Sequence, residues 1–221
     1  MEKVIAPWQL TGEGFIFIYK FSRKFINENG FLEDFQLENF TGGLGTVMCV
    51  NYTTSNVGPY LELLFIPGMI NLKKLDLENI KSGFTISKIY VSSQASVDNG
   101  INNWGIPKEL ADFQWNVLES GAIEIKVIKN NKLIFDAQFH KNKFKIPITT
   151  RFLPLKIIQK LGNQFFLTKP KANGKMALAK MKNSKIDSAF FPKIDLFKPL
   201  IGINISNFKM IFPEAIIDKN K

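Results

Sequence analysis

The stretch "AIEIKVIKNNKLIFDAQF" at residues 122–139 decides the fold class. Its first half alternates apolar and charged residues, with Ile123, Ile125 and Val127 on one face, which is typical of a half-buried β-strand. A second apolar run follows after Asn130 and Asn131. Asparagine tolerates positive φ, so this pair predicts a two-residue turn and an antiparallel hairpin.

Further β-rich runs lie on both sides of this hairpin, at residues 14–21, 46–52, 59–68 and 84–93. Helical signals are few. Ser22 is a candidate N-cap for a short helix, and residues 154–161 begin with proline and are followed by Gly162, which also predicts a helix. Many strands between turn signals predict a sandwich or a closed barrel. Most of the 21 phenylalanines are expected in the core; the alternative is an apolar cavity that binds a small molecule.

Composition limits the function classes. The 221 residues are 45% hydrophobic and 22% charged, which is an ordinary globular composition, and we expect a single domain over residues 1–221. The net charge of +10 invites a nucleic-acid reading, but Arg23 and Arg151 are the only arginines and the lysines are dispersed. We therefore expect neither a nucleic-acid nor a membrane partner. The absence of a signal-peptide pattern and the single cysteine favour a cytoplasmic location.

The usual catalytic residue sets are missing. His140 is the only histidine and Cys49 the only cysteine, so a zinc site and a Ser-His-Asp or Cys-His centre have no support. The glycine cluster "TGGLG" at residues 41–45 lacks the spacing of a phosphate-binding loop and is predicted to be a turn. No metal or organic cofactor is expected.

One lysine has unusual surroundings. In "NNWGIPKELADFQW" (residues 102–115), Lys108 lies among apolar and aromatic residues, and its nearest basic neighbours are Lys88 and Lys126. A lysine amine attacks ketones only when it is neutral, whereas its unperturbed pKa is about 10.4. Burial in an apolar site disfavours the charged form. Lys108 is thus a candidate nucleophile; the alternative is a surface lysine after a proline turn.

Two segments of the chain resemble the acetoacetate decarboxylase family. "GINNWGIPKELA" (residues 100–111) is similar to the family's Pro-Lys signature turn, and Lys108 falls on the lysine that forms the Schiff base. "GPYLELLFIPG" (residues 58–68) is similar to an upstream segment that carries a tyrosine and an active-site glutamate, which correspond to Tyr60 and Glu62. Weaker similarity at residues 15–21, 151–158 and 211–217 extends the resemblance over most of the chain.

The resemblance implies a mainly β fold, in which a curled antiparallel sheet with few short helices closes like a barrel around an apolar pocket. It implies a decarboxylase-type lyase that acts on a β-keto or related oxo acid through Lys108, with Glu62 moving a proton. The residues that line the substrate pocket would be Tyr60, Trp104, Ile106 and Pro107. Members of the family tend to form homo-oligomers, and we expect one here. The alternatives are an aldolase or dehydratase variant and a non-catalytic protein that binds a small apolar ligand.

Two positions depart from the family pattern. Glu109 replaces a second lysine that follows the reactive one, so desolvation has to activate Lys108 without a neighbouring cation. Gly12 and Glu13 stand where the family has an arginine thought to hold the substrate carboxylate. The alternative is that Arg23 or Arg151 takes over this role. The sequence therefore predicts a longer or aromatic oxo acid as substrate rather than acetoacetate.

Overall fold

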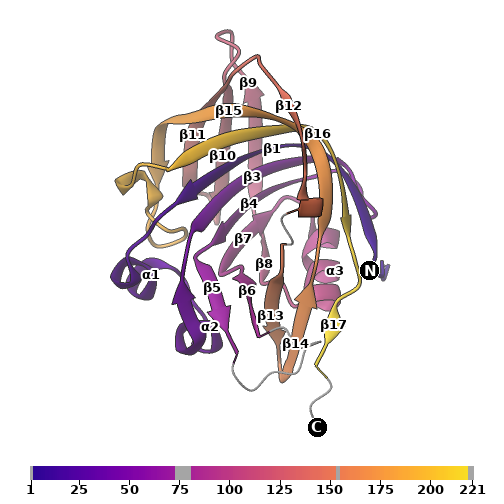
Figure 1. Cartoon of the computed structure of the whole chain (residues 1–221). Coiled ribbons are helices and arrows are strands. Elements are labelled where there is room, and N and C mark those ends of the chain that lie inside the picture. The colour runs from indigo at the N-terminus through magenta and orange to yellow at the C-terminus, as the bar shows by residue number, and fades with distance from the viewer. Residues whose placement is uncertain (1, 73–80, 153–154, 219–221) are drawn as a thin grey trace.

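The computed structural model describes residues 2–72, 81–152 and 155–218. Within these residues the chain is mainly β, and a strongly curled sheet arches over a smaller second sheet (Figure 1). This confirms the predicted fold class. The strands of the larger sheet are, in spatial order, β8 (Lys108–Leu110), β7 (Lys88–Val91), β4 (Tyr60–Ile66), β3 (Gly45–Thr54), β1 (Trp8–Tyr19), β16 (Ile201–Phe212), β15 (Lys171–Ile186), β11 (Lys132–Lys141), β10 (Ile123–Lys129) and β9 (Asp112–Val117), with β12 (Ile146–Thr149) also paired to β15.

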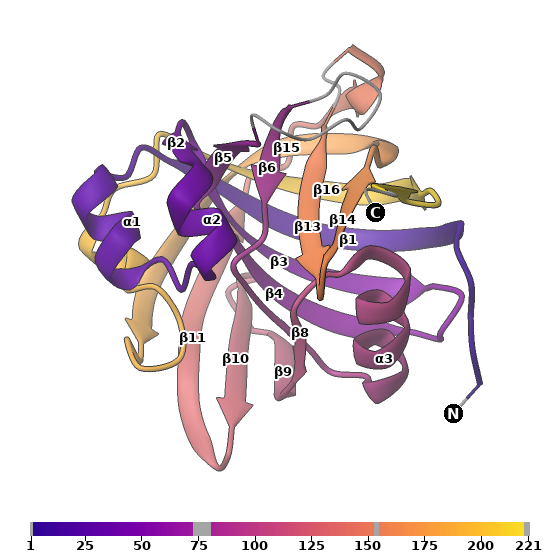
Figure 2. The ribbon, with the colours of Figure 1, turned by 90° about the horizontal axis from the view of Figure 1, so that it is seen from below.

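The smaller sheet and the helices lie on the open side of the arch, as the view from below shows (Figure 2). The strands of this sheet are β17 (Ile216–Ile217), β14 (Gln164–Thr168), β13 (Ile157–Leu161), β6 (Ser82–Thr85), β5 (Gly68–Asn71) and β2 (Phe40–Gly42). The helical elements are α1 (Arg23–Asn29), α2 (Asp34–Asn39), α3 (Gln94–Trp104) and the 3₁₀ turns η1 (Thr150–Phe152) and η2 (Ile194–Leu196).

Most of the predicted elements are present. Asn130 and Asn131 both have positive φ (52° and 59°) and join β10 to β11, as the sequence predicts. The Ser22 hydroxyl accepts a hydrogen bond from the amide of Phe25 and caps α1. The predicted strand at residues 84–93 is in fact divided between β6 and β7, which belong to different sheets.

The predicted helix at residues 154–161 is wrong for the part that the structure describes; Pro154 lies outside it. Residues 157–161 form strand β13, which turns back through Gly162 (φ 58°) and pairs with β14. The side chains of Ile157 and Ile158 are both buried, because one covers the site described below and the other packs into the main core. This burial on both faces favours a strand over the local helical signals.

The core has two parts, on opposite faces of the curled sheet. Alternation along β1 separates them: Phe15, Phe17 and Tyr19 pack in one hydrophobic cluster, while Trp8 and Leu10 pack in the other. Most of the buried phenylalanines belong to the first cluster, as expected for core residues. The second cluster surrounds the candidate site.

Helix α3 is fastened to the N-terminal segment by asparagine side chains. Asn99 accepts a hydrogen bond from the amide of Val4 (2.8 Å), and Asn103 accepts one from the amide of Ala6 (3.1 Å). Asn103 also donates to the carbonyl of Val4 (2.8 Å). The chain before β1 thus holds one side of the helix that borders the site.

A membrane-spanning helix would need a long apolar run, and none of the helices in the described ranges has the length and apolar character to cross a bilayer.

Candidate functional site

Lys108 is the first residue of the short strand β8. Helix α3 ends at Gly105, whose left-handed conformation (φ 64°) is the usual way for a chain to leave a helix. Ile106 and Pro107 then lead into β8, which pairs in parallel with β7 and places Lys108 beside Ile89. Only 7% of Lys108 is exposed to solvent. The alternative of a surface lysine is therefore wrong.

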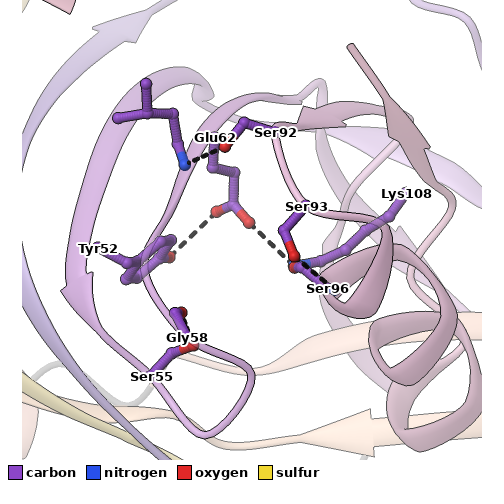
Figure 3. Close-up of polar contacts among 9 residues, drawn as sticks. Tyr52, Ser55, Gly58, Glu62, Ser92, Ser93, Ser96 and Lys108 are labelled. Carbon is purple, nitrogen blue, oxygen red and sulfur yellow. Dashed lines mark hydrogen bonds and ion pairs between the residues drawn. The ribbon is translucent and has the colours of Figure 1, made fainter. Parts of the chain in front are cut away.

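The Lys108 ammonium has three partners inside the protein. Its Nζ lies 3.0 Å from Glu62 Oε2 and 3.0 Å from Ser96 Oγ (Figure 3). It also lies 5.0 Å from the centre of the Tyr60 ring, over its face. The side chains of Lys108 and Glu62 are each 5% exposed, so this is a buried ion pair between the lysine and the glutamate.

Glu62 reaches the site because of alternation along β4. Tyr60, Glu62 and Leu64 point to the same face of the strand and line one cavity. The second carboxylate oxygen of Glu62, Oε1, accepts a hydrogen bond from the hydroxyl of Tyr52 (3.0 Å; Figure 3). Tyr52 lies opposite Tyr60 in the β3–β4 ladder, with ring centres 4.5 Å apart. Glu62 thus bridges a phenol and an amine.

The tyrosines of the site are held in their neutral form. Burial raises the pKa of the Tyr52 hydroxyl well above its ordinary value of 10.0, and the negative charge of Glu62 raises it further. Burial also raises the pKa of Tyr60 well above that value, again with a contribution from Glu62. Both phenols therefore remain proton-bearing hydrogen-bond donors at neutral pH.

Gly100 leaves room for the lysine. A Cβ atom at this position of α3 would lie 2.7 Å from Cδ and 2.9 Å from Cε of Lys108, closer than real Cβ contacts. The aliphatic part of Lys108 thus packs against the backbone of the helix whose first turn carries Ser96. Any larger residue at position 100 would displace the amine.

The amine opens into a cavity of about 100 Å³, which we call the inner cavity. Glu62 and Lys108 are the only charged side chains among its described lining residues, and most of the others are apolar. Of the residues predicted to shape the pocket, Tyr60, Trp104 and Ile106 line this cavity. Pro107 is half-buried and is not among the lining residues of this cavity.

The two departures from the family pattern lie away from the cavity. Glu109 follows Lys108 on β8 and points to the other face, where its carboxylate pairs with Lys88 (2.6 Å) and Lys129 (3.5 Å). Glu13 pairs with Lys141 (2.8 Å). Neither carboxylate reaches the amine, so Glu62 is the acidic partner of Lys108 in the described structure.

Neither arginine lies at the inner cavity. Arg23 donates to the carbonyl of Phe40 (2.8 Å) and lies over the ring of the same residue, far along the chain from the site. Arg151 lines a larger, outer basin next to the inner cavity. The described lining of the inner cavity therefore holds no cation other than Lys108.

Sequence reasoning missed Tyr52 and Ser96. Tyr52 ends the predicted strand at residues 46–52, and pairing this strand with the next one would have placed it near Tyr60. Ser96 was missed because helix α3 was not predicted. The local signals for that helix are Ser93, whose side chain caps its start, and Gly105 just after its end.

A metal centre would need clustered ligands. The described residues contain no group of three or more histidine, cysteine, aspartate or glutamate side chains that could hold an ion. The chemistry that this arrangement supports is that of an amine, a carboxylate and neutral hydroxyls in apolar surroundings.

Solved structures of several proteins share this fold. An acetoacetate decarboxylase from Legionella pneumophila is 14% identical, with a TM-score of 0.72 over 96% of this chain and 87% of its own. An acetoacetate decarboxylase-like enzyme from Sphingomonas wittichii is 9% identical, with a TM-score of 0.66 over 96% of this chain and 92% of its own. The enduracididine biosynthesis enzyme MppR is 9% identical, with a TM-score of 0.62 over 97% and 88% of the two chains.

Identities this low show the fold alone. No curated protein sequence matches this chain. The sequence profile described as acetoacetate decarboxylase (ADC), however, matches residues 3–167, which is most of the chain and includes Tyr52, Glu62, Ser96 and Lys108. The chain therefore belongs to the acetoacetate decarboxylase family.

Proposed function

We propose that this protein is a lyase that forms a Schiff base between Lys108 and an oxo acid and cleaves the bond to the carboxylate carbon. The observation that carries the proposal is the buried Lys108 amine, 3.0 Å from the Glu62 carboxylate and facing an apolar cavity. A structural ion pair needs no cavity beside it, whereas a nucleophilic amine needs space for a ketone. Bound pyruvate in the MppR structure is in keeping with an oxo acid as ligand.

The reaction begins with the removal of a proton from the Lys108 ammonium. Glu62 is the acceptor, because its Oε2 already receives the hydrogen bond from Nζ. The neutral amine attacks the carbonyl carbon, one amine proton and the proton held by Glu62 pass to the oxygen, which leaves as water, and an iminium forms. In a β-oxo acid, the bond between the α-carbon and the carboxylate then breaks, its electron pair moves into the neighbouring iminium to give an enamine, and carbon dioxide departs. Protonation of the enamine carbon and hydrolysis return the ketone product and the free lysine.

Glu62 and Tyr52 are suited to handle these protons together. Glu62 passes the lysine proton to the departing oxygen and then, after taking up a proton from solvent, protonates the enamine carbon. The Tyr52 hydroxyl donates to Oε1 of the same carboxylate throughout, because burial keeps that phenol neutral. Ser96 accepts a hydrogen bond from Nζ and so orients the amine.

The apolar lining favours loss of the carboxylate. A carboxylate in the inner cavity would meet no cation other than the reacting nitrogen. An unpaired charge in apolar surroundings is costly, whereas carbon dioxide is neutral. Release of carbon dioxide therefore removes the unfavourable charge. Aldol or dehydration chemistry would instead use an enamine formed by loss of a proton from the carbon next to the iminium, and the substrate would then keep its carboxylate outside the inner cavity.

Borohydride trapping tests the proposal. The protein is incubated with a panel of small keto acids and sodium borohydride, and the adduct is mapped by peptide mass spectrometry. Trapping is expected at Lys108 and is expected to disappear in Lys108→Met. A matched control is Lys88→Met on the neighbouring strand, whose side chain pairs with Glu109 and does not line the inner cavity. Adducts spread evenly over many lysines, or none at Lys108, would refute the lyase.

The second candidate function is the binding of a small apolar ligand without catalysis. The closed ion pair between Lys108 and Glu62 favours it, because both charges are already satisfied inside the protein. A binding protein would take up ligands without a covalent adduct and without release of carbon dioxide. Measuring carbon dioxide from the same keto-acid panel separates this candidate from the enzyme.

A further inference from the structure

We propose that a second pocket beside the inner cavity binds the apolar tail of the oxo substrate. This inference rests on the proposed function, since it takes the substrate's carbonyl to be at Lys108. It assigns the substrate class: an oxo acid whose carbonyl end reaches the lysine and whose other end is a short alkyl chain or a phenyl group. We call the second pocket the tail pocket.

The tail pocket lies on the same face of the large sheet as the inner cavity. Four neighbouring strands, β3, β1, β16 and β15, supply most of its lining, and β12 with η1 closes one side (Figure 1). Its volume is about 210 Å³, and most of its lining is aliphatic or aromatic. The apolar lining includes Ile16, Val50, Ile148, Ile203, Ile205 and Phe208. No charged side chain is among its described lining residues.

Three side chains line both the inner cavity and the tail pocket. These are Met48, Tyr52 and Met210. Tyr52 donates its hydroxyl to Glu62, so its ring stands between the reacting groups and the tail pocket. Methionine side chains are flexible and polarisable and adapt to a ligand at little cost. A chain that leaves Lys108 past Tyr52 therefore enters the tail pocket between adaptable apolar groups.

A glycine, Gly14, forms part of the lining of the tail pocket. Along β1, Leu10 lines the inner cavity and Ile16 lines the tail pocket, and between them Gly14 lines the tail pocket without a side chain. The register along the β1–β16 ladder shifts between Gly12 and Gly14, which locally bends the strand. A Cβ atom at Gly14 would lie 3.0 Å from the carbonyl oxygen of Cys49 and 3.3 Å from Cγ2 of Val50, so glycine lets β1 and β3 approach closely beneath the tail pocket.

The size of the tail pocket sets the size of the tail. An engineered apolar cavity of about 150 Å³ stays dry and binds benzene. The tail pocket is somewhat larger, at about 210 Å³. It therefore accommodates a phenyl ring or a short alkyl chain, a group that acetoacetate does not have.

Trapping with methyl ketones of increasing length tests the tail pocket. Acetone, pentan-2-one, heptan-2-one, nonan-2-one and 4-phenylbutan-2-one all form an imine through the same carbonyl and differ only in the tail. Each methylene that enters the pocket should tighten binding about fourfold. The ketone concentration that gives half-maximal trapping at Lys108 is expected to fall along the series and then level off once the pocket is full.

Two variants fill or enlarge the tail pocket without touching the inner cavity. Ala172→Phe adds a ring at a half-buried position of the lining, and Ile205→Ala removes three side-chain carbons from it. The first should abolish the gain for long ketones while acetone traps as before; the second should shift the optimum to longer tails. Ala189→Phe, the same substitution in an exposed turn, is the matched control and should behave as the unaltered protein.

The outcomes separate the two proposals. Trapping at Lys108 that does not depend on tail length, or that Ala172→Phe leaves unchanged, overturns the tail pocket and leaves the lyase standing. No trapping with any ketone overturns the lyase. The tail pocket is then tested alone, by calorimetric binding of nonan-2-one to Lys108→Met; binding that Ala172→Phe removes supports it, and absence of binding overturns it. A last outcome is that Ala172→Phe changes the size of the protein's assembly in sedimentation but leaves trapping unchanged. A second copy of the chain would then cover the pocket, and the tail-pocket proposal would also be overturned.

Discussion

Replacing Gly100 by alanine should separate stability from activity. Gly100 is buried in the middle of α3, and an added Cβ would lie 2.7 Å from Cδ and 2.9 Å from Cε of Lys108. The helix itself favours the change, because alanine is better than glycine in a helix interior by about 1 kcal/mol. The strain falls on the lysine side chain, which must rotate away to make room.

The size of the effect follows from the contacts that Lys108 makes. Moving its side chain off its rotamer costs about 0.5–1.5 kcal/mol, similar to the helical gain. If the shift is small enough to keep the ion pair with Glu62, the free energy of unfolding should therefore change by no more than about 1 kcal/mol in either direction; a complete break of this buried pair would instead cost about 3–5 kcal/mol. The amine, however, is held at 3.0 Å from both Glu62 and Ser96, and a displacement of about 1 Å can slow a positioned reaction about 100-fold.

The assay measures both quantities on the same protein. Thermal unfolding reports stability, and the rate of borohydride trapping of a keto acid reports the amine. The control is Asn102→Ala, which introduces the same residue at an exposed position of the same helix. Trapping by Gly100→Ala at the rate of the unaltered protein would refute the reasoning, and so would a loss of trapping that is fully explained by unfolding.

The remaining predictions concern the charges and hydroxyls of the site. Glu62→Gln should slow decarboxylation at least tenfold, because the amide cannot accept the lysine proton; carbon dioxide release measures it, and unchanged turnover would remove the proton-transfer role. Tyr52→Phe leaves Oε1 of Glu62 without its donor and should cost about 1–3 kcal/mol of unfolding free energy in denaturant titration; an unchanged midpoint would contradict this. Glu109→Ala should leave the trapping rate unchanged, since its partners are Lys88 and Lys129; a faster or slower rate would show that its charge reaches the amine. All four tyrosines of the chain have a pKa raised first by burial, so the native protein should show no tyrosinate absorbance near pH 10 and should lose stability as the pH rises above about 10, the ordinary pKa of tyrosine in the unfolded chain. A non-cooperative titration at that pH would contradict it.

Sequence patterns predicted the strands better than the connections between them. The alternation at residues 122–129 and the Asn130–Asn131 turn depend on local backbone preferences and on one buried face, and both are present in the structure. The segment at residues 157–161 has the same local signals as a helix, and its strand conformation comes from pairing with β14 and β6, partners that no local window contains.

The candidate site also has features that the sequence indicated and features that depend on tertiary packing. The apolar neighbours of Lys108 in sequence indicated a buried amine, and alternation on β4 indicated that Tyr60 and Glu62 share a face. The partnership of Ser96 with Lys108 depends on how α3 packs against β8, and that packing depends on the absence of a side chain at Gly100. Such a contact is set by tertiary structure, so residues 93–105 gave only the capping signals of a helix.

The attachment of α3 to the first residues of the chain has a consequence for protein engineering. Val4 and Ala6 hold Asn99 and Asn103, and Ser96, three and seven residues earlier on the same side of this helix, contacts the reactive amine. A fusion partner or affinity tag joined directly to residue 2 would lie next to this connection, whereas one joined after residue 218 would lie nearer the other end of the helix, where Trp104 donates a hydrogen bond to the carbonyl of Pro213 (2.7 Å). Kinetic constants measured on N-terminally tagged protein are therefore best compared with those of a C-terminally tagged form before any rate is assigned to the site itself.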